Sequence, residues 1–123
     1  MNDSAEWSSL AEDADSGRLL LDRGAAARCA VHCAEFVNHL VALREKAYSL
    51  GRLDGFGTFP SGIALATKFS RKAVGGDYSM VQALTDHIAE VEAMREVFER
   101  IEARYAAAEQ RGEERFAAID PGR

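Results

Sequence analysis

No helix can run through residues 53–62, and this stretch constrains the fold more than any other. It contains three glycines and the first of the chain's two prolines. Glycine readily adopts the left-handed backbone that ends helices, and Pro60 favours extended geometry at Phe59. Because the segments on both sides have helical patterns, we expect a turn that joins two helical arms, with Phe56 and Phe59 at its tip.

The first arm is predicted to be one long helix over about residues 19–53. Asp22 suits its N-cap or first turn, and Gly51 suits its C-terminal end. Its apolar residues are spaced alternately by three and four, which is the heptad pattern of helices that cross at about 20°. They are Ala26, Cys29, Cys33, Phe36, Leu40, Leu43, Ala47 and Leu50, flanked by Val37, Val41 and Tyr48. A helix of about 30 residues is roughly 45 Å long and needs an equally long mate.

The second arm begins with a short helix over residues 61–73, for which Ser61 is the expected N-cap. Gly75 and Gly76 then predict either a kink or a break, and the sequence leaves both open. Residues 79–82 have the pattern of a capping box and predict a second long helix to about Gln110, before Gly112. Its apolar residues, again mostly three or four apart, are Val81, Leu84, Ile88, Val91, Met94, Phe98, Ile101, Tyr105 and Ala108.

These patterns predict an all-α fold with one helical hairpin domain over residues 19–112. Residues 1–18 are rich in Ser, Asp and Glu and predict a flexible acidic tail with at most a frayed helical turn around Trp7; residues 113–123 predict a flexible C-terminal tail. Two helices bury only the sides that they turn toward each other, so a second hairpin is expected to complete a four-helix bundle. The expected helix–helix interface comprises Cys29, Cys33, Phe36, Leu40, Leu43, Leu50, Leu84, Ile88, Val91, Phe98 and Ile101.

Catalytic chemistry is not expected, because no nucleophile with a base, carboxylate pair or metal-ligand spacing stands out. Cys29 and Cys33 predict buried reduced thiols, since His32 and His39 do not complete a tetrahedral metal site with them. No cofactor is therefore expected. The net charge of -5 disfavours nucleic acid and anionic lipid as general partners. We find neither a membrane-spanning run nor a cleaved signal peptide, so stable membrane insertion is not expected and synthesis is expected in the cytoplasm.

The chain resembles the WxG helical-hairpin family of type VII (ESX) secretion substrates in two short motifs. Phe56-Gly57-Thr58-Phe59 stands between the two arms, where that family has Trp-x-Gly. Tyr105 and Glu109 match the Tyr-x-x-x-Asp/Glu signal near the end of the family's second helix. The likeness covers about residues 19–112. The chain departs from the family in lacking a tryptophan at the turn and in carrying the additional short helix and the Gly75-Gly76 interruption.

The resemblance implies a non-enzymatic secretion substrate, or a targeting partner of a co-secreted protein, that dimerises through its hairpin and is exported without a cleaved signal peptide. It implies a secretion signal at Tyr105 and Glu109, a turn motif at Phe56, Gly57, Phe59 and Gly62, and recognition of both by a secretion ATPase. The partner is then a second copy or a related hairpin. A cytosolic adaptor or antitoxin-like module that uses the same apolar surface remains the alternative. Nucleic-acid binding through Arg52, Lys68, Arg71 and Lys72 is disfavoured by the net charge.

Overall fold

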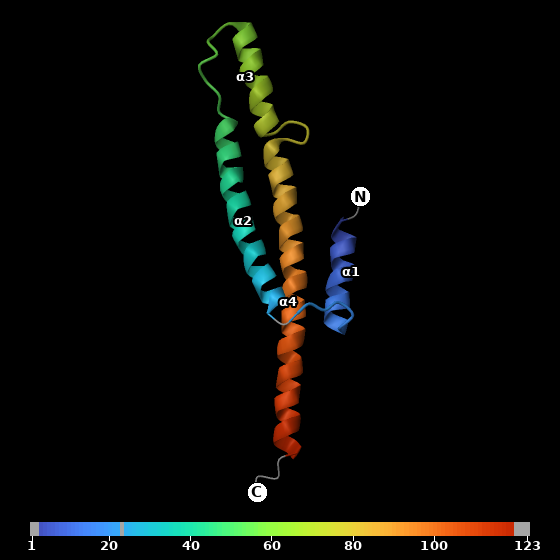
Figure 1. Ribbon diagram of the computed structural model, residues 1–123. Coiled ribbons are helices and arrows are strands. Elements are labelled where there is room, and N and C mark those ends of the chain that lie inside the picture. The colour runs from blue at the N-terminus through green and yellow to red at the C-terminus, as the bar shows by residue number, and fades with distance from the viewer. Residues whose placement is uncertain (1–2, 23, 120–123) are drawn as a thin grey trace. The chain divides into compact units, whose positions relative to one another are not determined.

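The computed structural model describes residues 3–22 and 24–119, which form four α-helices and no strand (Figure 1). The helices are α1 (Asp3–Ser16), α2 (Ala25–Leu50), α3 (Pro60–Ala73) and α4 (Met80–Ile119). The predicted all-α class is confirmed. The chain divides into two compact units, one formed by residues 1–34 and 92–123 and the other by residues 35–91.

In the unit of residues 35–91, α2 and the first turns of α4 lie side by side and run in opposite directions (Figure 1). Val37, Leu40 and Ala47 of α2 are buried, as is Val91 of α4. The Arg44 guanidinium donates a hydrogen bond of 3.3 Å to the Thr85 hydroxyl across the pair. The two arms of the predicted hairpin therefore contact each other here.

The connection between α2 and α3 packs against the small side chains of α3. Gly62, Ala66, Ser70 and Ala73, spaced by three and four residues, are the part-buried or buried positions of this helix. The Ser70 hydroxyl donates a hydrogen bond of 2.6 Å to the carbonyl oxygen of Gly51, which directly follows α2. Phe56 stacks on Phe69 with ring centroids 6.3 Å apart. The turn thus returns along α3 and is held at both of its ends.

Both ends of α3 follow from local backbone chemistry. Phe59 is its N-cap in an extended conformation and Pro60 occupies its first turn, where a missing N–H costs nothing. The predicted Ser61 cap is wrong, because the helix begins one residue earlier and no side chain caps it. Beyond Ala73, Gly75 has φ of +81° and the Gly76 amide donates a hydrogen bond of 3.0 Å to the Arg71 carbonyl. This Schellman-type bond ends the helix, so the glycine pair is a break and not a kink.

The start of α4 agrees with half of the predicted capping box. The Ser79 hydroxyl accepts a hydrogen bond of 3.3 Å from the Gln82 amide, as an N-cap serine should. The Gln82 side chain does not complete the box and instead donates to Asp86 at 3.0 Å. A hydrogen bond with Asp86 also raises the pKa of the Tyr78 hydroxyl. Asp86 therefore interacts with both Gln82 and Tyr78 at the start of α4.

The other unit corrects the expected N-terminal tail, because residues 3–16 form α1. Ala11 and Ala14 of α1 are buried with Val97 and Ile101 of α4 and Ala26 of α2. Trp7 and Leu10 pack against this cluster, so the spacing of residues 7, 10, 11 and 14 was the missed helical signal. The acidic residues that made the segment look unstructured occupy other positions of the helix. Residues 1 and 2 lie outside the described part of the chain.

A Schellman motif ends α1 at Gly17, whose φ is +80°. The amide of Arg18 donates to the Asp13 carbonyl at 2.9 Å and the amide of Gly17 to the Ala14 carbonyl at 3.2 Å. The Arg18 guanidinium also lies 3.0 Å from the Asp13 carboxylate. A glycine at a helix C-terminus is itself a sequence signal, and Gly17 marks the end of a helix in a segment whose composition suggested a flexible tail.

The boundaries of the long helices differ from prediction at three places. Helix α2 begins at Ala25 and not near residue 19, because Gly24 has φ of +83° and Leu19 and Leu21 pack on the buried cluster as an irregular segment. It ends at Leu50, directly before Gly51, and so is shorter than the range to residue 53. Helix α4 continues through Gly112 to Ile119, since one glycine costs a helix only about 1 kcal/mol. Residues 120–123 of the expected tail lie outside the described residues.

Substituting Gly62 by alanine is expected to destabilise the protein by about 1–3 kcal/mol, the range for a buried steric clash. A Cβ atom at Gly62 would clash with the carbonyl oxygen of Phe56, a backbone atom that cannot move aside as the end of a flexible side chain can. Urea denaturation followed by circular dichroism measures the change. Gly112→Ala is the matched control: nothing lies within 4 Å of its Cβ position, so it should stabilise α4 by about 0.5–1 kcal/mol. Equal stability of the two variants would contradict the close approach at Gly62.

Candidate interaction surface

Three large apolar side chains of α2 lie exposed at intervals of seven residues. Phe36, Leu43 and Leu50 are 51%, 48% and 50% exposed. Seven residues are close to two turns of an α-helix, so the three side chains share one face. We call these three residues the apolar stripe; all of them belong to the unit of residues 35–91.

The adjacent register of α2 is buried instead. Val37, Leu40 and Ala47 are the buried residues of this part of the helix, and they face the contact with α4. Steps of three and four describe both registers equally well, so the sequence could not decide which one faces α4. The contact with α4 uses the Val37 flank and leaves the Phe36 flank in water.

The predicted interface residues therefore divide into three groups. Within the chain, Cys33, Leu40, Val91 and Ile101 are buried, whereas Cys29, Leu84, Ile88 and Phe98 are partly buried. Phe36, Leu43 and Leu50 are exposed, and their role in an interface stays a prediction. These three exposed side chains are the part of the expected interface that the single chain does not bury.

The two cysteines lie on α2 as free thiols. Cys33 is buried and Cys29 is partly buried. Burial raises the pKa of the Cys33 thiol, and the neighbouring Cys29 raises it further. Because a thiol must ionise to attack or to ligate a metal, this environment favours an inert packing role. Among the residues that the structure describes, no group of three or more His, Cys, Asp or Glu side chains could hold a metal ion.

Tyr105 of the proposed secretion signal is held inside its own unit. Its ring packs against the buried cluster around Ile101, and its hydroxyl donates a hydrogen bond to the carbonyl oxygen of Leu21. This bond fixes the irregular segment between α1 and α2. Glu109, one turn further along α4, is exposed. The pair thus consists of one structural tyrosine and one carboxylate at the surface.

The proposed turn motif lies in the other compact unit. Phe59 is 78% exposed, Phe56 is exposed despite its stacking on Phe69, and Gly57 has φ of +84°. Gly62 is the position at which α3 and the Phe56 carbonyl approach each other. A common recognition surface of this motif with Tyr105 and Glu109 stays a prediction.

Tyr105→Phe is expected to lower the free energy of unfolding by about 1 kcal/mol, because the Leu21 carbonyl loses its donor. Thermal denaturation at fixed protein concentration measures the loss. Tyr48→Phe is the matched control: Tyr48 is an exposed tyrosine of α2, and its change should stay within about 0.5 kcal/mol. If Tyr105→Phe lowered the free energy of unfolding less than Tyr48→Phe does, the proposed role of Tyr105 in holding the Leu21 segment would be contradicted.

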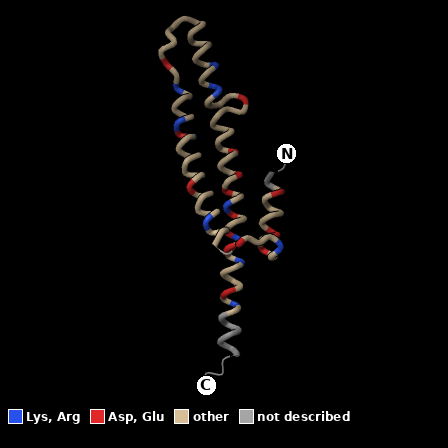
Figure 2. Tube along the Cα trace, in the orientation of Figure 1, with Lys and Arg blue, Asp and Glu red and all other residues tan. Residues whose placement is uncertain are grey.

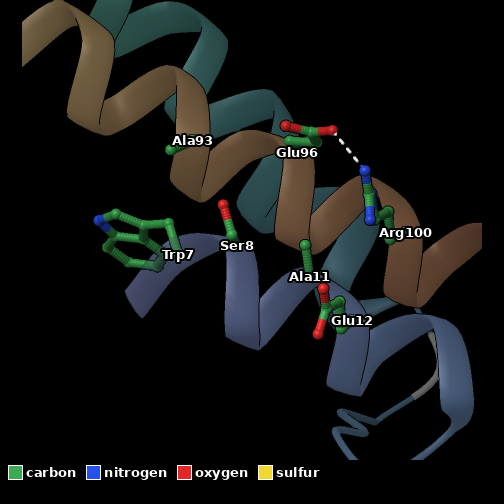
Figure 3. Close-up of a pocket in the computed structure, with 7 residues that line it drawn as sticks. All are labelled: Trp7, Ser8, Ala11, Glu12, Ala93, Glu96 and Arg100. Atoms are coloured by element: carbon green, nitrogen blue, oxygen red, sulfur yellow. Dashed lines mark hydrogen bonds and ion pairs between the residues drawn. The ribbon is translucent and has the colours of Figure 1, made fainter. Parts of the chain in front are cut away.

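A hollow of about 400 Å³ separates parts of α1 and α4 (Figure 3). Its walls are Trp7, Ser8, Ala11, Glu12, Ala93, Glu96 and Arg100. Arg100 is already paired with Glu96 at 2.8 Å and with Asp15 at 2.9 Å. The hollow therefore presents no uncompensated cation to an anionic ligand, and no histidine or cysteine lines it.

Comparison with known proteins gave no match to a family model, to a curated protein or to a solved structure. Within the described ranges, no helix is both long and apolar enough to cross a membrane.

Proposed function

We propose that this chain is a non-enzymatic helical hairpin that binds a second helical hairpin through its apolar stripe. The observation that carries the proposal is the exposure of Phe36, Leu43 and Leu50 beside a buried register of the same helix. Single exposed apolar residues are normal on a protein surface, but three on one helical face form a seam of the kind that packs against another helix.

The size of the stripe fits one side of a helix–helix contact. Fully burying a leucine or phenylalanine side chain is worth about 1.5–3 kcal/mol, and each of the three is about half exposed. Their burial supplies a few kcal/mol, which is less than association costs on its own. Further contacts must come from the neighbouring helix of the pair, where Leu84 and Ile88 are only partly buried. A four-helix bundle made from two hairpins would bury both sets.

We further propose that the paired hairpin is a type VII secretion substrate or the targeting partner of a co-secreted protein. The support is the aromatic-glycine turn at Phe56-Gly57 and the Tyr105-to-Glu109 spacing on α4. The Glu109 side chain is exposed and therefore accessible to a secretion ATPase, whereas the Tyr105 hydroxyl donates inward to the Leu21 carbonyl. A cytosolic adaptor with the same stripe is the alternative.

An export assay in a producing cell tests the secretion proposal. Glu109→Gln is expected to reduce the exported fraction at least about tenfold while leaving thermal stability unchanged, because Glu109 lies on the surface. Glu45→Gln, at an exposed glutamate of α2, is the control and should be exported normally. Normal export of the Glu109 variant would exclude Glu109 from the signal, and export of neither variant nor the parent chain would favour the cytosolic adaptor.

A further inference from the structure

Helix α3 buries its small residues and exposes its large ones. Gly62, Ala66, Ser70 and Ala73 face the connection to α2, whereas Ile63, Leu65 and Phe69 are exposed. A helix that belongs only to its own hairpin would be expected to do the reverse, because the large side chains gain most from burial. The exposed side of α3 is therefore suited to an external apolar phase.

The charge of the chain is segregated around this helix. Residues 55–76, which we call the tip segment, contain Lys68, Arg71 and Lys72 and no acidic residue, so all 20 acidic residues lie outside it. Figure 2 shows α3 with basic segments and no acidic one. We call these three residues the basic triplet. The net charge of -5 belongs to the whole chain, whereas the tip segment is locally cationic and attracts anionic lipid.

Apolar and basic side chains alternate along one side of α3. Lys68 follows Leu65 by three residues and Lys72 follows Phe69 by three, so each of these two apolar side chains has a cation about one turn away. Lysine stems can lie along apolar surface while their ammonium groups reach outward. Phe59, at the N-terminus of α3, adds an aromatic ring that is 78% exposed.

We infer that the tip segment binds the surface of an anionic lipid bilayer, with Phe59, Leu65 and Phe69 in the interface and the basic triplet at the headgroup phosphates. A short basic amphipathic helix is the element that binds such surfaces. Binding at the interface requires no membrane-spanning helix. The inference is independent of the proposed pairing, since it uses none of the apolar stripe, and it requires neither Tyr105 nor Glu109; it shares Phe59 with the proposed turn motif.

A bilayer fits this surface better than a partner helix does. The exposed apolar residues of the tip segment lie on both flanks of α3 and on the connection before it: Phe56, Phe59, Ile63, Leu65 and Phe69. A partner helix needs a linear seam, such as the apolar stripe of α2. A fluid lipid phase accepts side chains without a fixed register and contributes anionic headgroups around them.

The test is co-sedimentation of the full chain with vesicles of phosphatidylcholine containing phosphatidylserine, against vesicles of phosphatidylcholine alone. The parent chain is expected to bind the anionic vesicles and to be released as salt is raised. Replacing the basic triplet with glutamine should weaken binding about a hundredfold, since each cation near such a surface contributes about a fivefold factor.

The matched control removes the same number of charges elsewhere. Arg28, Lys46 and Arg111 are exposed basic residues outside the tip segment, and the chain with all three changed to glutamine has the same net charge as the triplet variant. Its binding should stay within about threefold of the parent. Equal losses in the two triple variants, or equal binding to both kinds of vesicle, would overturn the inference.

A fluorescence measurement reports directly whether residue 59 enters the bilayer interface. In a Trp7→Phe background, Phe59→Trp places the only tryptophan at the tip, and its emission should shift to the blue with anionic vesicles. The unchanged chain, with Trp7 packed against the buried cluster, should show no shift. Unshifted emission from the tip tryptophan would overturn the inference. The inference would also fail if the chain bound an acidic protein or a nucleic acid but no vesicles.

Discussion

Replacing Ile101 by alanine is expected to lower the free energy of unfolding by about 2–5 kcal/mol, the range for truncating a fully buried aliphatic side chain. Ile101 is 1% exposed, and the alanines of α1 and α2 in the same cluster, Ala14 and Ala26, are too small to fill the space that it would leave. Urea denaturation at one fixed protein concentration gives the loss. Among the residues that the structure describes, it is the largest stability effect expected for one aliphatic truncation.

Val31→Ala is the control for Ile101→Ala, because Val31 is an exposed valine of α2. Its effect should stay within about 0.5 kcal/mol. Hydrogen exchange separates local from global loss, since amides of α1 should lose protection in the Ile101 variant first if α1 is held mainly by this cluster. A loss below about 1 kcal/mol would contradict the burial of Ile101 between α1, α2 and α4.

Replacing Leu43 by glutamate is expected to weaken association of the hairpin with its partner at least about a hundredfold, because a carboxylate in a closed apolar contact is left without a partner. Leu43 is half exposed in the single chain, so the free energy of unfolding of the monomer should change by no more than about 0.5 kcal/mol. Sedimentation over a concentration series measures the association separately from the folding.

The control for Leu43→Glu is Val31→Glu, an equally drastic change at an exposed apolar residue of the same helix. Val31 does not belong to the seven-residue spacing of the apolar stripe, so association should be retained. Equal weakening by both substitutions would mean that charge, and not the stripe, controls association. Normal association of the Leu43 variant would exclude the stripe as the contact.

The sequence patterns predicted an all-α chain and the main breaks between its helices, because turn chemistry and apolar spacing are local. The break at residues 51–59, the start of α3 next to Pro60 and the Ser79 cap of α4 each depend on a few neighbouring residues. The choice between the Val37 and Phe36 flanks depends on where α4 lies. Alternating steps of three and four residues contain no information on that choice.

Helix α1 shows how composition can hide a helix. Its acidic and serine residues suggested a flexible tail, yet Ala11 and Ala14 allow α1 to approach α4 closely. The Arg100 and Arg104 side chains of α4 bind Asp15 at the end of α1, through its carboxylate at 2.9 Å and its carbonyl at 2.8 Å. These cations lie more than 80 residues away in sequence, so no local reading could pair them with the acidic segment.

The candidate sites were predictable to different degrees. The place of Phe56 and Phe59 at a turn follows from the local sequence, but their exposure does not, since large aromatic side chains are expected to be buried. The inward role of Tyr105 depends on the carbonyl of Leu21, in a segment expected to be helical. Because α2 begins after Gly24, the Leu21 carbonyl has no amide partner within a helix. It accepts a hydrogen bond from the Tyr105 hydroxyl instead. The motif singled out Tyr105, whereas the backbone around Gly24 determines which group its hydroxyl binds.

The mass of the complex in solution tests the central claim most directly. The unmodified chain is measured alone and after co-expression with the adjacent open reading frame, by light scattering on a sizing column. Pairing through the apolar stripe predicts twice the single-chain mass alone or a one-to-one complex with the co-expressed chain, and loss of either in the Leu43→Glu variant. A single-chain mass in both preparations would contradict the account.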